Sequence, residues 1–388
     1  MVAVLIPSVV TRSMKYDLAT KLLKKSKGRH DDLIKAFEAK DLHQPGLMQA
    51  VAASIADGGT VMAQYVTETV LPAYGQAVVP LLVSAFDPNG KKVDARRLEA
   101  IRRIDPSTAR QLARTALNAT HEDLVIEVIR SLHGSVTDSM SISELSKRGN
   151  VLIQREAFLA LSGVTEQAVV DAIADYFRRE TPWVSHAIQF TQHPSYTDLC
   201  VSALQSLGAQ ADTASCLTEK QARWLSWVLR ACQGHGGSEL DKALSAWVVR
   251  ASKGFFDEVS GHWNKSELAE AVAMSTTPRA QRLLVAARDC FDLGEMTPIM
   301  GAAACHADLD LVELFSSYLA PSNKPGRCHG WFCGCGGDWP CSLYSAVEFA
   351  LDVDFESADY RGRKPHRLQL PVIQRIRDDP RWHTARFA

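Results

Sequence analysis

The sequence predicts an all-α protein built as an α-solenoid, which is an elongated array of stacked helices. Three observations predict this fold. Similar helical stretches recur along the chain, apolar residues at helical spacing mark one buried face in each stretch, and residues 31–250 show no alternating strand pattern. A chain of 388 residues also exceeds what one core usually supports, so two domains or one repeat array is expected.

Four helical stretches carry the recurrence. They read RRLEAIRRID, LVIEVIRSLHG, IQREAFLALSG and LCVSALQSLG, and they close on Ile104, Leu132, Leu161 and Leu207, which are spaced 28, 29 and 46 residues apart. Each is followed by a residue type that ends helices, namely Asp105-Pro106, Gly134, Gly163 and Gly208. Partner helices are expected between them, so the stretches pair into stacked layers.

This pattern resembles HEAT-like repeats, whose second helix often reads like the REAFLALSG segment of this chain. The resemblance covers about residues 31–250, and it places a HEAT-like helical repeat domain at 31–253. It implies a long curved binding surface rather than a deep reactive pocket. A helical domain without repeats is the alternative for this region.

The segment from Arg282 to Phe315 resembles an ankyrin repeat. Thr297-Pro298-Ile299-Met300 matches the family's T-P-L-H opening of an inner helix, where Thr297 is expected to cap the helix and Pro298 to occupy its first position. A weaker opening follows at Ser342–Leu351, and an earlier unit begins near Asn264. The resemblance predicts a short ankyrin-like array over residues 254–360.

A cysteine-rich insertion, residues 321–341, interrupts this array. Its segment RCHGWFCGCGGDWPC spaces four cysteines as C-x4-C-x-C-x5-C: Cys328, Cys333, Cys335 and Cys341. Four thiolates in a glycine-rich loop suit a structural zinc ion, although the spacing lacks the C-x2-C knuckle of zinc ribbons. The alternatives are therefore a zinc site with these four ligands and a loop of free or partly oxidised thiols.

Charge is distributed unevenly along the chain. Residues 1–30 form a basic N-terminal segment and residues 361–388 a basic C-terminal tail, each with a net charge of +6, so residues 31–360 carry −13. A protein that wraps along nucleic acid needs a continuous basic face, so nucleic acid is not the expected partner. The two ends are interpreted as solvated segments.

The same composition bears on the compartment. No stretch approaches the roughly 18 uninterrupted apolar residues of a membrane span, and the start of the chain is not typical of a secretion signal. Nine cysteines without such a signal favour a reducing, cytoplasm-like compartment, with organellar or nuclear import left open.

Other motifs predict structure rather than chemistry. QGHGGSEL, Gln233 to Leu240, lacks the lysine of a phosphate loop and is interpreted as a link between helices. CHADLD, Cys305 to Asp310, places His306 near two aspartates but is interpreted as a turn. Trp224 and Trp227 are spaced as an apolar helix face and are expected to pack in a core. No catalytic residue is predicted.

These observations favour a non-enzymatic scaffold or regulatory protein that binds other proteins through an α-solenoid surface. Two alternatives remain. HEAT-like repeats occur in a family of DNA glycosylases with tryptophans and a carboxylate at a basic concave face, a role open to Trp183, Trp224 and Trp227. The other alternative is an effector or inhibitor whose acidic surface binds a basic partner. The identity of the partner and the oligomeric state are not predicted.

Overall fold

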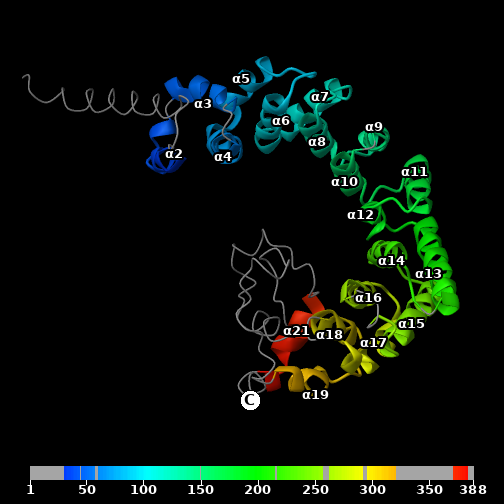
Figure 1. The fold of residues 1–388 in the computed structure, drawn as a ribbon. Helices are drawn as coiled ribbons and strands as arrows, with labels where there is room; N and C mark the ends of the chain where they lie inside the picture. Colours follow the sequence, from blue (N-terminus) through cyan, green and yellow to red (C-terminus); the bar gives the residue numbers. More distant parts are fainter. Residues whose placement is uncertain are drawn as a thin grey trace, which may run out of the picture. The chain divides into compact units, whose positions relative to one another are not determined.

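A computed structural model describes residues 30–43, 45–56, 60–148, 150–214, 216–256, 262–291, 295–319 and 370–382. Within these ranges every regular element is a helix and no strand forms, so the predicted all-α class is confirmed (Figure 1). The chain divides into two compact units, Met1–Leu161 and Ser162–Ala388.

This division lies inside the stretch that was predicted as a single domain. The predicted boundary at residue 253 instead falls between helices that pack together, since α16 (His262–Ala273) contacts both α14 (Glu219–Ala231) and α15 (Ser238–Ser252). The finer domain boundaries remain predictions.

The first unit is a succession of short helices. They are α2 His30–Glu38, α3 Met48–Ser54, α4 Thr60–Tyr65, α5 Val79–Ser84, α6 Lys92–Ile104, α7 Pro106–Thr115, α8 Glu122–Leu132, α9 Ser139–Ser146 and α10 Val151–Ala160. Helix α8 packs against both α6 and α10, while α7 contacts α6 and α8. Leu98 and Ile101, from the predicted apolar face of α6, are fully buried.

Side-chain caps set several helix starts in this unit. Asp105 ends α6, and its carboxylate accepts hydrogen bonds from the backbone N–H groups of Ser107 and Thr108, both at 3.1 Å, at the start of α7. Asn150 caps α10 in the same way through the N–H of Leu152 at 2.8 Å. Such caps satisfy donors that the first turn of a helix leaves unpaired, so these starts follow from local sequence.

No single helix among the described residues is long and apolar enough to cross a membrane. One pair, Val61–Val70 and Pro72–Ser84, has sufficient length and composition together but is bent by 70°.

The second unit contains longer helices. They are α11 Gln167–Arg178, α12 Ser185–Ile188, α13 Pro194–Ala214, α14, α15, α16, α17 Pro278–Ala286, α18 Met296–Ala304, α19 Leu311–Phe315 and α21 Leu370–Asp378. Helices two apart in sequence pack against each other, which makes two rows: α11, α13, α15 and α17 in one, and α12, α14, α16 and α18 in the other. Contacts of α13 with α14 and of α17 with α18 join the rows.

The loops between the rows are bonded to one another. Phe190 N–H donates to Gln233 O at 2.8 Å, Gly234 N–H to Met274 O at 2.9 Å, and Thr276 N–H to His235 O at 2.9 Å. His235 lies at the centre, 1% exposed, with Nε2 3.0 Å from Ile188 O. A carbonyl oxygen can only accept, so Nε2 carries the proton in this bond. The predicted linking role of QGHGGSEL is confirmed.

Two details of the sequence prediction are wrong. Gly208 does not end a helix but lies inside α13, where the Arg250 guanidinium lies against it and donates to Gly208 O at 3.4 Å. Thr297 does not cap α18, since the helix begins one residue earlier at Met296 and the buried Thr297 hydroxyl has no hydrogen-bond partner among the described residues. Pro298 still lies in the first turn, where backbone N–H groups need no intrahelical acceptor.

Candidate functional site

The predicted zinc ligands Cys328, Cys333, Cys335 and Cys341 lie outside the described residues. Within the described ranges, no three His, Cys, Asp or Glu side chains converge as they would to hold a metal ion. The prediction of structural zinc therefore rests on the sequence alone.

The five described cysteines are unbridged, as predicted. Burial and the neighbouring Cys200 thiol raise the pKa of Cys232 well above its ordinary value. A thiol in this state is protonated near neutral pH and is a poor nucleophile. The buried pair formed by Cys200 and Cys232 thus belongs to the core of the second unit.

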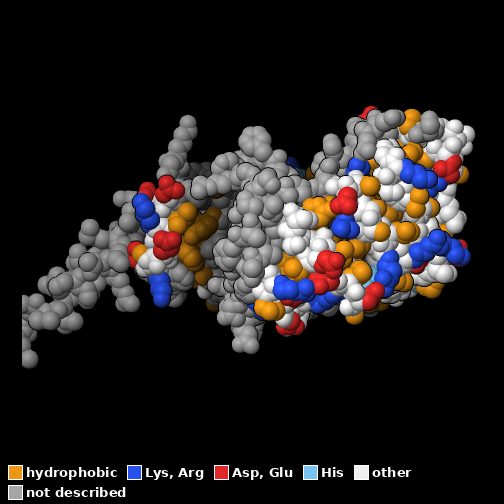
Figure 2. All heavy atoms as spheres, turned by 90° about the horizontal axis from the view of Figure 1, so that it is seen from below, with side chains coloured by type: hydrophobic (Ala, Val, Ile, Leu, Met, Phe, Trp, Pro, Cys, Tyr) orange, Lys and Arg blue, Asp and Glu red, His pale blue; other side chains and the backbone are white. Residues whose placement is uncertain are grey.

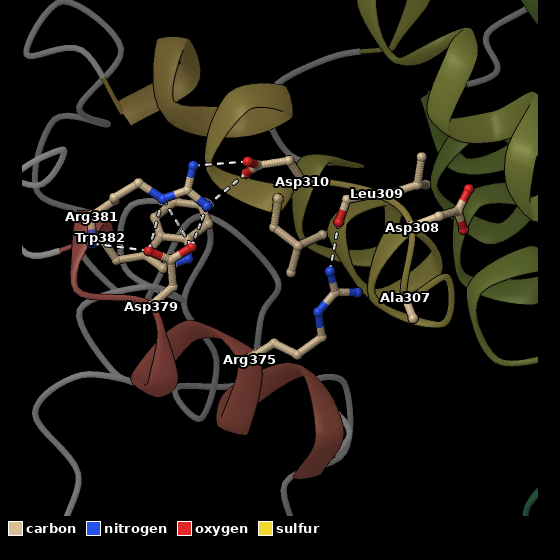
Figure 3. Close-up of a pocket in the computed structure, with 9 residues that line it drawn as sticks. Ala307, Asp308, Leu309, Asp310, Arg375, Asp379, Arg381 and Trp382 are labelled. Atoms are coloured by element: carbon tan, nitrogen blue, oxygen red, sulfur yellow. Dashed lines mark hydrogen bonds and ion pairs between the residues drawn. The ribbon is translucent and has the colours of Figure 1, made fainter.

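One hollow of about 280 Å³ lies between the α18–α19 link and α21 (Figure 3). Arg381 bridges the carboxylates of Asp310, at 2.8 Å, and Asp379, at 2.6 Å. Arg375 donates to the carbonyls of Ala304, His306 and Leu309. These groups already satisfy one another, so the hollow marks the contact by which α21 docks beside α18 and the α18–α19 link.

That contact corrects one expectation about the tail. Residues 361–388 were interpreted as a solvated basic segment, yet Arg375 and Arg381 are bound to carbonyls and carboxylates of the α18–α19 link. Ile376 and Trp382 beside them are fully buried. The predicted turn at CHADLD is confirmed, because α18 ends at Ala304 and α19 begins at Leu311.

Two further hollows meet at Trp224 in the second unit. The larger, of about 570 Å³, is lined by Phe177, Arg178, Glu180, Ser195, Asp198, Leu199, Ser202, Ala203 and Trp224. The smaller, of about 310 Å³, is lined by Glu180, Pro182, Glu219, Lys220, Arg223, Trp224 and Trp227. Because they share Glu180 and Trp224, we treat them as one feature, the tryptophan groove, formed by α11, α13, α14 and the turn after α11.

Aromatic rings form the walls of the tryptophan groove. Trp224 is 8% exposed and packs on Phe177, with 4.9 Å between ring centroids. Trp227 is half-buried, and its ring lies 4.8 Å from that of Trp183, which in turn stacks on His186 at 5.7 Å. Aromatic surface of this kind provides much contact area with few rotatable bonds.

The turn that carries Trp183 has an unusual backbone. Glu180 has a φ of 56° and Trp183 a φ of 69°, and both are residues with side chains in the left-handed region. That conformation is sparsely populated for a bulky residue and costs about 1–3 kcal/mol unless the surroundings impose it. The Trp183 ring packs on Trp227 and His186, while Glu180 and Pro182 of the same turn line the groove.

The charged groups at the rim of the groove are mostly paired. Arg178 lies 3.0 Å from Asp175, Lys220 lies 2.6 Å from Glu180, and Arg223 pairs with Glu219. Asp198, exposed on α13, forms no ion pair among the described residues. The groove therefore combines an apolar wall with one carboxylate that is open to a cation.

Sequence reasoning found part of this site. Trp183, Trp224 and Trp227 were singled out, and the structure brings them together. The expectation of core packing is confirmed for Trp224, whereas Trp227 remains half-buried at the surface. Glu180 and Asp198 were missed, because nothing in their local sequence indicates that α11 and α13 converge beside α14.

Comparison of the chain with family models, curated proteins and solved structures gives no match in any of the three.

Proposed function

We propose that the chain is a non-enzymatic binding protein, a scaffold or regulatory module, that holds a protein partner on a solenoid surface. Support comes from the two rows of helices in the second unit, in which each helix packs on the helix two places along. Such stacking is typical of repeat proteins, which use extended surfaces for binding. The HEAT-like and ankyrin-like assignments belong to this proposal.

The observation that carries the proposal is the tryptophan groove. Its combined hollows are of the size of ligand sites, aromatic rings form part of its walls, and Glu180 and Glu219 at its rim are held in ion pairs with Lys220 and Arg223. Tryptophan is among the residues that most often dominate protein interfaces.

A displayed library of linear peptides, selected on the full chain, tests this function. We expect enriched peptides whose binding is abolished by Ser202→Arg, which fills the larger hollow from an exposed position on α13. Gln205→Arg is the matched control, since Gln205 is exposed on the same helix but does not line the groove. Peptides that bind both variants equally, or a library without enrichment, would contradict the proposal.

A DNA-binding or DNA glycosylase-type activity is the second candidate, favoured by the convergence of Trp183, Trp224 and Trp227 beside carboxylates. Against it, the basic and acidic side chains of the described residues are interspersed on the face seen in Figure 2. Binding to duplex DNA that weakens steeply with salt would support this candidate. Its absence at low salt would remove it.

We further propose that Cys328, Cys333, Cys335 and Cys341 hold a structural zinc ion. Elemental analysis of the purified chain is expected to give one zinc per molecule, and a chelator is expected to lower the melting temperature. A chain free of metal in which all nine thiols titrate would overturn this proposal.

A further inference from the structure

We propose that the tryptophan groove takes an extended peptide segment of a partner protein, in which a lysine or arginine binds Asp198 and a nearby apolar side chain enters the hollow beside Trp224. This inference rests on the proposed function and specifies the partner of the same site. It is drawn from the charges, the wall chemistry and the backbone of the groove.

The ion pairs at the rim favour a positively charged ligand over a negatively charged one. Each lining cation already has a carboxylate within ion-pair distance, which partly neutralises its charge and weakens its attraction for an incoming anion. An incoming cation meets Asp198, which has no cation beside it among the described residues. The net charge of −13 on residues 31–360 likewise favours a positively charged ligand.

The apolar part of the groove lies next to this carboxylate. Leu199 follows Asp198 on α13, and Ala203 lines the same hollow one turn further along. Together with Trp224 these residues form a wall that buries an apolar side chain. A ligand that presents a cation and an apolar group in close succession therefore satisfies both parts of the hollow.

An extended segment suits the arrangement of the two hollows. They share Glu180 and Trp224, and an extended chain presents every second side chain to one face, so one extended segment offers alternate side chains to the two neighbouring hollows. The turn with the left-handed residues Glu180 and Trp183 is already packed, because the Trp183 ring contacts Trp227 and His186. A preformed wall loses little entropy when the ligand arrives.

The contribution of Asp198 is expected to lie in selectivity more than in strength. It is exposed, and an exposed ion pair adds little affinity and is screened by salt. The apolar side chain in the hollow provides most of the binding, and the cation fixes which segments are accepted.

The experiment measures dissociation constants by calorimetry on the full chain with synthetic versions of library-selected peptides. We expect these peptides to share a Lys or Arg close to an apolar residue. Changing that Lys or Arg to Glu is expected to weaken binding to the unmodified chain by about tenfold at low salt and less at about 0.5 M salt. Asp198→Arg is expected to reverse this preference. Glu313→Gln, an exposed carboxylate on α19, is the matched control.

The outcomes separate this inference from the proposed function. Peptides that Ser202→Arg abolishes but that lack a basic residue, or that bind Asp198→Asn and the unmodified chain equally, would overturn the inference and leave the function standing. A failure to find any peptide sensitive to Ser202→Arg would overturn both. If Ser202→Arg instead dissociates a dimer of the chain in ultracentrifugation, a second copy occupies the groove and the inference is wrong.

Discussion

Arginine side chains join helices two apart in the first unit. In the first unit Arg102 of α6 donates to Glu127 of α8 at 2.5 Å, and Arg130 of α8 donates to Glu156 of α10 at 3.0 Å. The two arginines are 28 residues apart, which is also the spacing of the apolar residues that close these helices. The same contact is therefore repeated from one helix to the next.

Glu127 makes the stability of the first unit depend on pH. Burial raises the pKa of Glu127 to about 7, against the opposing effect of Arg102. A carboxyl whose folded-state pKa is raised favours the folded chain below its ordinary pKa of 4.5, and this advantage is lost as pH rises through about 7. The free energy of unfolding is expected to fall by about 3 kcal/mol between about pH 5 and pH 8.

Urea unfolding as a function of pH measures this effect. Glu127→Gln carries no titrating group and is expected to lose that part of the pH dependence, whereas Glu144→Gln, exposed on α9, is expected to keep it. An unchanged pH profile in Glu127→Gln would show that the two arginines keep the carboxylate ionised.

Arg375 provides a second prediction for a single residue. Its guanidinium donates to three carbonyl groups at the end of α18 and in the following link, at 3.0, 3.0 and 2.6 Å. Arg375→Ala leaves these acceptors without that donor and is expected to cost about 1–3 kcal/mol. Thermal melting measures the loss, and Gln374→Ala, exposed on the same helix, is expected to change it little. Equal melting of the two variants would mean that α21 docks through apolar contacts alone.

Capping and helix-ending residues set where several helices of this chain begin and end. Hydrogen bonds between loops link the stacked helices of the second unit. Asp105, Asn150 and Asp310 cap α7, α10 and α19, and Gly134 and Gly163 adopt left-handed conformations after α8 and α10. In the second unit, the loop from Gln233 to Gly237 is bonded to the loops before and after it.

Gly234 is a position where the bonded loops approach each other closely. Its φ is 83°, and an added Cβ would lie 2.8 Å from the Cα of Phe190. Gly234→Ala is expected to destabilise the chain by about 2–4 kcal/mol, because the two backbones must separate. Gly163→Ala, with a φ of 80° but open space around it, is expected to cost only about 1 kcal/mol. Urea unfolding of both variants measures the difference. Equal losses of unfolding free energy would mean that backbone strain alone, and not the contact with Phe190, destabilises Gly234→Ala.

At the scale of the whole molecule, the division into two units predicts that damage to one leaves the other intact. Leu98 is fully buried in α6, so Leu98→Ala is expected to cost about 2–5 kcal/mol. Hydrogen exchange followed by mass spectrometry should then increase in α6 to α10 and not in α13 to α18. Gly234→Ala should produce the reverse. A uniform increase in either variant would show that the chain unfolds as a single unit.

The sequence by itself determined the helical class, the position of most helices and the linking role of the QGHGG and CHADLD segments. These features depend on periodicity and on capping or breaking residues, which act over a few neighbouring positions. Residue type alone was not sufficient at Gly208, which lies inside α13, or at Thr297, which does not cap α18.

Only the tertiary structure determined which side chains come together at the surface. Trp183 and Trp227 are far apart in sequence, yet their rings pack 4.8 Å apart, and Asp198 of α13 lines the same hollow as Phe177 of α11 and Trp224 of α14. Likewise, the sequence shows Arg375 and Arg381 only as charges of the tail. In the structure they hold α21 in place, because carbonyls and carboxylates of the α18–α19 link lie opposite them. Such sites depend on which helices become neighbours, and the packing of buried faces between distant segments decides that.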